Sequence, residues 1–127
     1  MIVPLSSWAQ DRLPLEDWMS KQVSQLYGFS EKLIRRWIEE EQFIFLLDGL
    51  DEMEEAARPF CIAAINLYHH AHLVPLVVCS RRVEYEYAAR NERLYLQCAL
   101  LVQPLSQEQI QEYMRSMGSH VEALSAA

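Results

Sequence analysis

Glycine and lysine are scarce in this 127-residue sequence, which holds three glycines and two lysines. The glycines are Gly28, Gly49 and Gly118, and neither Lys21 nor Lys32 follows a glycine. The loop G-x-x-x-x-G-K-[ST], whose backbone amides and lysine bind nucleotide phosphates, is therefore absent. Nine of the eleven basic residues are arginines, which can still form local positive sites for an anion.

Long apolar runs and an excess of basic charge are also missing. No run approaches the roughly 18 apolar residues that a membrane span needs, and residues 1–5 carry no basic segment of the kind that opens a signal peptide. Eighteen acidic against eleven basic residues give a net charge of −7. Nucleic acids and anionic membranes attract basic surfaces, so the charge argues against both as partners.

The three cysteines follow no CxxC spacing. Cys61, Cys79 and Cys98 all lie in apolar stretches, which predicts buried free thiols in a reducing compartment. With 51% hydrophobic and 23% charged residues, the composition suits one soluble globular domain. We therefore expect a cytoplasmic protein.

Apolar runs predict the strands. Residues 2–5 form a short one, and the continuous runs at residues 43–47 and 73–79 are typical of strands buried on both faces. Pro75 is expected among the first residues of the latter strand. Residues 94–102 alternate apolar and other side chains and end before Pro104, which predicts a further strand.

Helical patterns separate these runs. An apolar face runs from Leu15 to Tyr27, with Pro14 at its start and Gly28 at its end. Other helices are expected after Ser30, from Pro59 onward, and after Ser106. Ser106 and Gln109 have capping-box spacing, and the helical face that follows stops before Gly118. Strands that alternate with helices indicate an α/β fold with a largely parallel sheet.

Polar clusters follow two of the expected strands. Residues 48–52, DGLDE, come directly after the run at 43–47, and Ser80, Arg81 and Arg82 follow the run at 73–79. In open α/β sheets, ligands bind beyond the carboxyl ends of the strands. Carboxylates there can hold Mg²⁺ beside nucleotide phosphates or orient water, and an arginine can bind a γ-phosphate.

Four segments of the chain resemble consecutive parts of the NACHT group of P-loop NTPases, within the STAND class of signalling ATPases. FIFLLDGLDE is similar to their Walker B segment, and LVPLVVCSRR to the next strand with its sensor 1 arginine. MIVPLSSWA is similar to the strand after the P-loop helix, and LLVQPLSQEQIQEYM to the last sheet strand and the first helix beyond it. The resemblance spans the chain in family order. It implies a partial NACHT domain over residues 1–105 and the beginning of a helical subdomain over 106–127.

The resemblance implies roles for five residues. Asp48 would bind Mg²⁺, Gly49 would take the small-residue position, and Asp51 and Glu52 would handle water or magnesium. Arg81 would be the sensor 1 arginine. The implied cofactor is Mg²⁺ with ATP or GTP, in an incomplete P-loop NTPase-like parallel sheet flanked by helices. The implied function is a nucleotide-controlled switch in an oligomerising signalling protein, whose partners are further copies or fused effector and sensor domains.

The missing phosphate-binding loop departs from the family pattern. In the family this loop lies upstream of the matching segments, and its strand sits between the sensor 1 strand and the last strand. We therefore expect an interior piece of a longer protein, able to hydrolyse NTP only where that protein supplies the loop. The alternative is a non-catalytic α/β interaction module derived from such an NTPase, because unpaired sheet edges and exposed apolar faces invite association.

Individual residues also have plainer interpretations. Residues 48–52 could cap the following helix without any metal. Arg81 and Arg82 could form surface ion pairs with Glu84 or Glu86, which contribute little to stability. Three histidines near residue 70 suggest zinc, but their position in the last turn of a helix and their spacing favour a role without metal.

Overall fold

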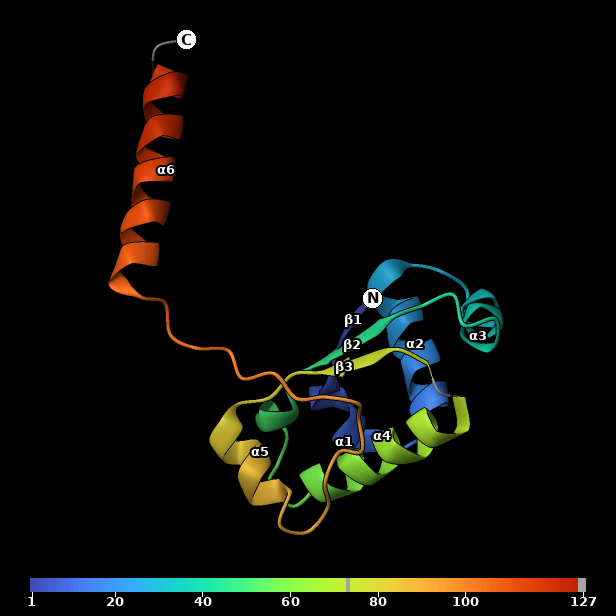
Figure 1. Ribbon diagram of the computed structural model, residues 1–127. Coiled ribbons are helices and arrows are strands. Elements are labelled where there is room, and N and C mark those ends of the chain that lie inside the picture. Colours follow the sequence, from blue (N-terminus) through green and yellow to red (C-terminus); the bar gives the residue numbers. More distant parts are fainter. Residues whose placement is uncertain (73, 126–127) are drawn as a thin grey trace.

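The computed structural model shows an α/β fold and describes residues 1–72 and 74–125. Its sheet has three parallel strands in the order β1 (Ile2–Pro4), β2 (Phe45–Asp48), β3 (Leu76–Val78). Figure 1 shows β2 between the other two strands. The predicted parallel sheet is thus confirmed for these three segments. Pro75 directly precedes β3 and is not part of it, and Leu73 lies outside the described residues.

Helices connect the strands and cover one side of the sheet. In chain order the helical elements are η1 (Leu5–Ser7), α1 (Trp8–Asp11), α2 (Leu15–Tyr27), α3 (Glu31–Glu39), η2 (Leu50–Glu52), α4 (Arg58–His72), α5 (Arg82–Ala88) and α6 (Gln107–Ser125). None of these described helices is long and apolar enough to cross a membrane.

The predicted helix ends are largely confirmed. Gly28 ends α2 in the left-handed conformation, at φ 76°. The Ser30 hydroxyl accepts the backbone N–H of Leu33 at 3.4 Å and begins α3. At α6 the capping box is reciprocal, since Ser106 N–H donates to the Gln109 side chain at 2.9 Å and Gln109 N–H to the Ser106 hydroxyl at 3.2 Å. The helix does not stop at Gly118, however, but continues to Ser125.

The hydrophobic core lies between the sheet and helices α2 and α4. Side chains from alternate strand positions meet the buried face of each helix. The core residues of the strands and of these two helices are Val3, Leu15, Trp18, Met19, Val23, Phe45, Leu47, Cys61, Ile62, Ile65, Tyr68 and Leu76.

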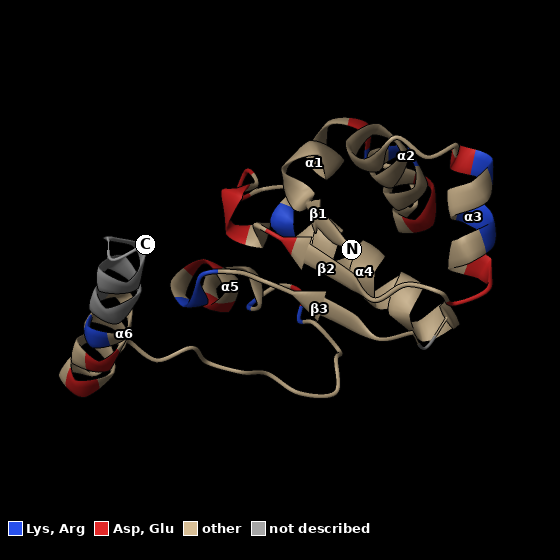
Figure 2. Cartoon of the chain, turned by 90° about the horizontal axis from the view of Figure 1, so that it is seen from above, with Lys and Arg blue, Asp and Glu red and all other residues tan. Residues whose placement is uncertain are grey.

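The opposite face of the sheet is open, which corrects the expectation of strands buried on both faces. Ile2, Leu46 and Val77 align across the three strands. Ile2 is 55% exposed and Val77 is 45% exposed. Figure 2 looks onto this face, with α4 behind the sheet. The helices of the described chain cover only the other face. The apolar strand residues that alternate with the core residues therefore remain uncovered.

The predicted strand at residues 94–102 is wrong, because the structure has no regular element there. Leu94 and Leu96 pack against the core, whereas Leu100 and Val102 are almost fully exposed. The Asn66 side chain of α4 bonds to the backbone of this segment: its amide donates to the Arg93 carbonyl at 2.7 Å, and its oxygen accepts the N–H of residue 95 at 2.9 Å. Beyond this segment, α6 stands away from the rest of the fold (Figure 1).

The cysteines differ from the expectation of three buried thiols. Cys61 on α4 is fully buried, but Cys79 and Cys98 are exposed. Burial raises the pKa of the Cys61 thiol from 9.0 to about 12. Apolar neighbours in sequence did not indicate burial here, because Cys79 follows the end of β3 and Cys98 lies in the irregular segment.

Thiol labelling at pH 8 should therefore show two reactive cysteines in the native chain and three after denaturation. The thiolate is the reactive form, and a pKa near 12 in place of 9.0 lowers its fraction at Cys61 about a thousandfold. A variant with Cys79→Ser and Cys98→Ser should react only when unfolded. Fast reaction of this variant in the native state would contradict the burial of Cys61.

Candidate nucleotide site

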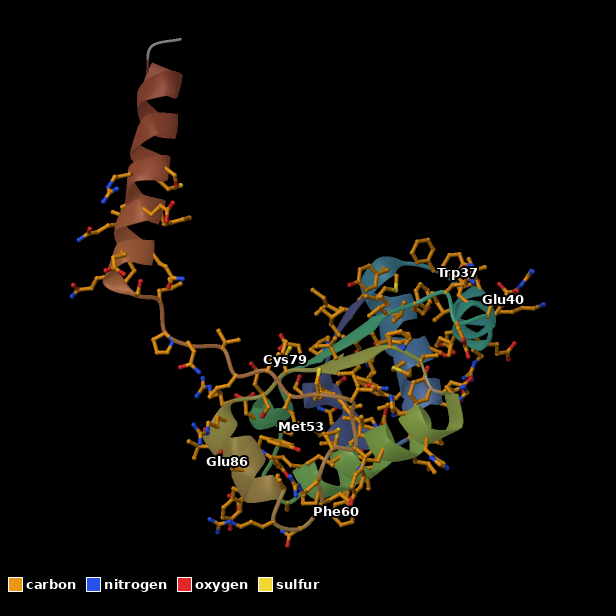
Figure 3. The ribbon with its side chains drawn as sticks, viewed as in Figure 1. Trp37, Glu40, Met53, Phe60, Cys79 and Glu86 are labelled. Carbon is orange, nitrogen blue, oxygen red and sulfur yellow. The ribbon has the colours of Figure 1, made fainter. Side chains whose placement is uncertain are left out.

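The two polar clusters meet at the carboxyl edge of the sheet, as expected from parallel strands. Cys79 N–H donates to the Leu47 carbonyl at 2.8 Å, and Leu50 N–H donates to the Cys79 carbonyl at 3.2 Å. These bonds extend the β2–β3 pairing into the loops that follow the strands. Cys79 and Met53 mark the two loops in Figure 3. The DGLDE loop and the arginines after β3 thus form one surface.

Asp48 is the last residue of β2, and its side chain is exposed. A cation is therefore not required to offset burial of its charge. The exposed carboxylate is accessible to an external ligand at the sheet edge. The end of β2 is the position that the resemblance implies for the magnesium-binding residue.

Gly49 turns the chain from β2 into η2 in the left-handed conformation, at φ +77°. A side chain here would be strained, and a Cβ would lie 2.9 Å from Oε2 of Glu52. Glycine therefore allows the Glu52 carboxylate to fold back over the turn. Asp48 and Glu52, two of the three acidic side chains of the turn, carry oxygen donors of the type that Mg²⁺ prefers.

Asp51 and Arg81 form the central contact of the site. Arg81 Nε lies 3.3 Å from Asp51 Oδ2, and the Arg81 backbone N–H donates to Asp51 Oδ1 at 3.1 Å. The Asp51 side chain is 13% exposed, whereas that of Arg81 is 79% exposed. One carboxylate thus connects the two loops and leaves most of the guanidinium open to solvent.

Arg82 and Arg81 have different surroundings. Arg82 Nε lies 2.7 Å from Oε1 of Glu86, one turn further along α5. This hydrogen bond to Glu86 raises the pKa of Arg82. The plainer interpretation, a surface ion pair within the helix, therefore describes Arg82, while Arg81 turns toward the acidic loop.

Arg58, at the start of α4, was missed by the sequence reasoning. Its guanidinium donates to the Asp51 carbonyl at 2.9 Å and to the Met53 carbonyl at 3.2 Å. It therefore fixes the backbone of the acidic loop from the helix that follows. The available signal was an arginine in the first turn after an acidic loop, a place where loop carbonyls need donors.

Metal binding by clustered side chains finds no support in the described part of the chain. No three histidine, cysteine, aspartate or glutamate side chains converge there in a metal-binding group. His69 is paired with Gln97 at 3.2 Å, and His72 with Glu16 at 3.5 Å. Magnesium bound beside a nucleotide is a different case, because one or two carboxylates and the phosphate oxygens suffice.

A shallow groove lies elsewhere, between α4 and the segment after α5. Its lining includes Asn66, His69, Glu92 and Tyr95. This groove is farther along α4 than Arg58 and shares no residue with the carboxyl edge of the sheet.

In comparisons with models of protein families, with curated proteins and with solved structures, nothing matches this chain.

Proposed function

We propose that this chain is part of a NACHT-type nucleotide-binding signalling NTPase, in which binding and hydrolysis of Mg·ATP or Mg·GTP switch an oligomerising protein. The observation that carries the proposal is the contact of Asp51 with Arg81 at the carboxyl edge of β2 and β3. Ligands of open α/β sheets bind at this edge. An acidic loop and an arginine on adjacent strands supply the charges that a magnesium nucleotide needs.

The sheet order also supports this proposal. In the family that the sequence resembles, the strand of the phosphate-binding loop lies beside the sensor 1 strand, on the side away from the Walker B strand. The matching position here is the outer edge of β3, which pairs with no strand in the described part of the chain. We propose that a segment outside these 127 residues supplies that strand and its loop.

Each residue of the site has a proposed role. Asp48 would bind Mg²⁺ beside the turn at Gly49, and Mg²⁺ would neutralise phosphate charge. Asp51 and Glu52 would orient and deprotonate the attacking water. Arg81 would donate hydrogen bonds to the γ-phosphate and stabilise charge as the phosphoryl group transfers.

The test begins with the coding sequence upstream of this chain, read in the same frame. If it encodes a strand followed by GxxxxGK[ST], the protein containing both parts should hydrolyse ATP or GTP. Asp48→Asn or Arg81→Gln should each lower kcat by about 10²–10³, the usual cost of losing a charge-stabilising group. Arg82→Gln is the matched control, since Arg82 is paired with Glu86, and should retain full activity.

Two outcomes would reject the proposal. One is an upstream frame that closes without a phosphate-binding loop. The other is undiminished turnover in both Asp48→Asn and Arg81→Gln. Turnover is measured for each variant as the release of inorganic phosphate at saturating nucleotide.

A second candidate function is a non-catalytic interaction module, which the exposed apolar residues favour. Ile2 and Val77 lie on the open face of the sheet, and Leu100 and Val102 lie in the segment before α6. Large exposed apolar patches mark sites of association. Under this alternative, light scattering would show discrete self-association without nucleotide, and Asp48→Asn would leave it unchanged.

A further inference from the structure

We propose that the Asp51 carboxylate and an incoming phosphate compete for the Arg81 guanidinium, so that phosphate binding frees an oxygen of Asp51. This inference rests on the proposed function and deepens it, because it assigns Asp51 two successive partners. In the structure Asp51 holds Arg81 in place. In the occupied site the guanidinium contacts phosphate, and the freed oxygen can accept a hydrogen bond from water.

The geometry separates the two bonds that Asp51 makes. Oδ1 accepts the backbone N–H of Arg81, and Oδ2 contacts the guanidinium Nε. Arg58 holds the Asp51 carbonyl independently. Loss of the Oδ2 contact therefore leaves Asp51 held at Oδ1 and at its backbone carbonyl, and the loops need not separate when the Arg81 side chain moves.

The guanidinium contact can be exchanged at low cost. Its distance of 3.3 Å is longer than the roughly 2.7–2.9 Å of strong charge-assisted hydrogen bonds. The Arg81 side chain is also mostly exposed, and exposed ion pairs contribute little to stability. A guanidinium has five N–H donors, and Arg81 faces Asp51 through Nε. The remaining donors can begin to bind phosphate before the ion pair breaks.

Asp51→Asn tests this competition in the full 127-residue chain. Asparagine retains an oxygen for the Arg81 backbone N–H but loses the charge that attracts the guanidinium. In NMR spectra of arginine side chains, the Arg81 Nε–H should exchange with water faster in this variant. Inorganic tripolyphosphate, the probe, should shift the Arg81 signal at a concentration about two- to fivefold lower than in the parent chain, the effect of removing one exposed ion pair.

Glu86→Gln is the matched control, because it breaks the neighbouring Arg82 ion pair on α5. It should change the Arg82 signal and leave both the Arg81 signal and the tripolyphosphate response unchanged. In the parent chain tripolyphosphate should also shift the backbone N–H signal of residue 81, which bonds to Asp51. Arg81→Gln keeps this backbone bond but lacks the guanidinium, so tripolyphosphate should no longer shift that signal, which tests the anion site even if Asp51→Asn does not fold.

Three results would overturn the competition. They are an unchanged Arg81 exchange rate in Asp51→Asn, an unchanged or weaker response of that variant to tripolyphosphate, and a full shift of the residue-81 backbone N–H signal by tripolyphosphate in Arg81→Gln. Failure of the proposed function has a different signature. In that case the longer protein would not hydrolyse nucleotide, while the Arg81 signal would still respond to Asp51→Asn and tripolyphosphate as expected.

Discussion

Trp18→Ala is expected to lower the free energy of unfolding by about 3–5 kcal/mol, the usual cost of removing a large aromatic side chain from a core. Trp18 is the largest fully buried side chain, only 1% exposed, and lies on α2 between the helices and the sheet. Its indole N–H also donates to the Ser7 hydroxyl at 3.2 Å. Alanine would leave both a cavity and an unpaired hydroxyl. Urea denaturation followed by far-UV circular dichroism measures the loss.

Tyr113→Ala provides the matched control for Trp18→Ala. Tyr113 is an aromatic residue of similar size on α6, but its side chain is 63% exposed. Its removal should change the free energy of unfolding by no more than about 0.5 kcal/mol. A cost below about 1 kcal/mol for Trp18→Ala would contradict the packing of α2 on the sheet, given the usual cost of such cavities.

Four helices, α2, α3, α4 and α6, could be predicted from the sequence because their signals are local, whereas α1 and α5 were not predicted. Gly28 and Ser30 each act on backbone groups within a few residues. The reciprocal bonds between Ser106 and Gln109 are of the same kind. Gly118 shows the limit of such signals, since a glycine within a helix lowers its stability without ending it.

Strands were less predictable because each depends on a neighbour. Residues 94–102 alternate as a strand should, yet no partner strand lies beside them in the described chain. Asn66, some thirty residues earlier, provides the hydrogen bonds that hold the beginning of this segment. A periodic pattern indicates which side chains could share a face, but it carries no information on what they pair with.

The sequence pattern also could not predict which faces of the sheet the helices cover. Continuous apolar runs at 43–47 and 73–79 are typical of parallel strands with helices on both sides. The helices of the described chain pack on one side only, which leaves Ile44, Leu46 and Val77 partly or largely exposed. The pattern is that of a complete two-sided sheet, and this agrees with the proposal of a larger parent protein.

For the candidate site, the sequence could predict that the two loops meet at one edge of the sheet. It could not predict which side chains of the two loops contact each other. Parallel strands bring their carboxyl ends to one edge, so the meeting of the DGLDE loop with the arginines followed from the strand assignment. The choice of Arg81 as the partner of Asp51 depends on the conformation of two loops. The support from Arg58 depends in addition on the position of α4.

The free energy of unfolding is expected to fall as the pH rises above 9. Burial raises the pKa of Cys61 from 9.0 to about 12. Burial, with smaller contributions from Glu16 and Glu41, raises that of Tyr68 from 10.0 to about 12. Above these unfolded-state values the unfolded chain releases protons that the folded chain retains, so the equilibrium shifts toward unfolding. Between its unfolded-state and its folded-state pKa, each group should lower the free energy of unfolding by about 1.4 kcal/mol per pH unit.

Two variants separate the contributions to this alkaline loss. Between pH 9 and 10 only Cys61 of the two titrates in the unfolded chain, so Cys61→Ala should abolish its part of the slope there. Tyr68→Phe keeps the buried ring but removes the hydroxyl, and it should reduce the slope only above pH 10. Urea denaturation at half-unit steps from pH 8 to 11 measures both slopes. The thiol of Cys61 makes stability depend on pH only if its pKa is higher in the folded than in the unfolded chain. An identical slope in Cys61→Ala and the parent chain between pH 9 and 10 would therefore show that this thiol is not shielded from water in the folded chain.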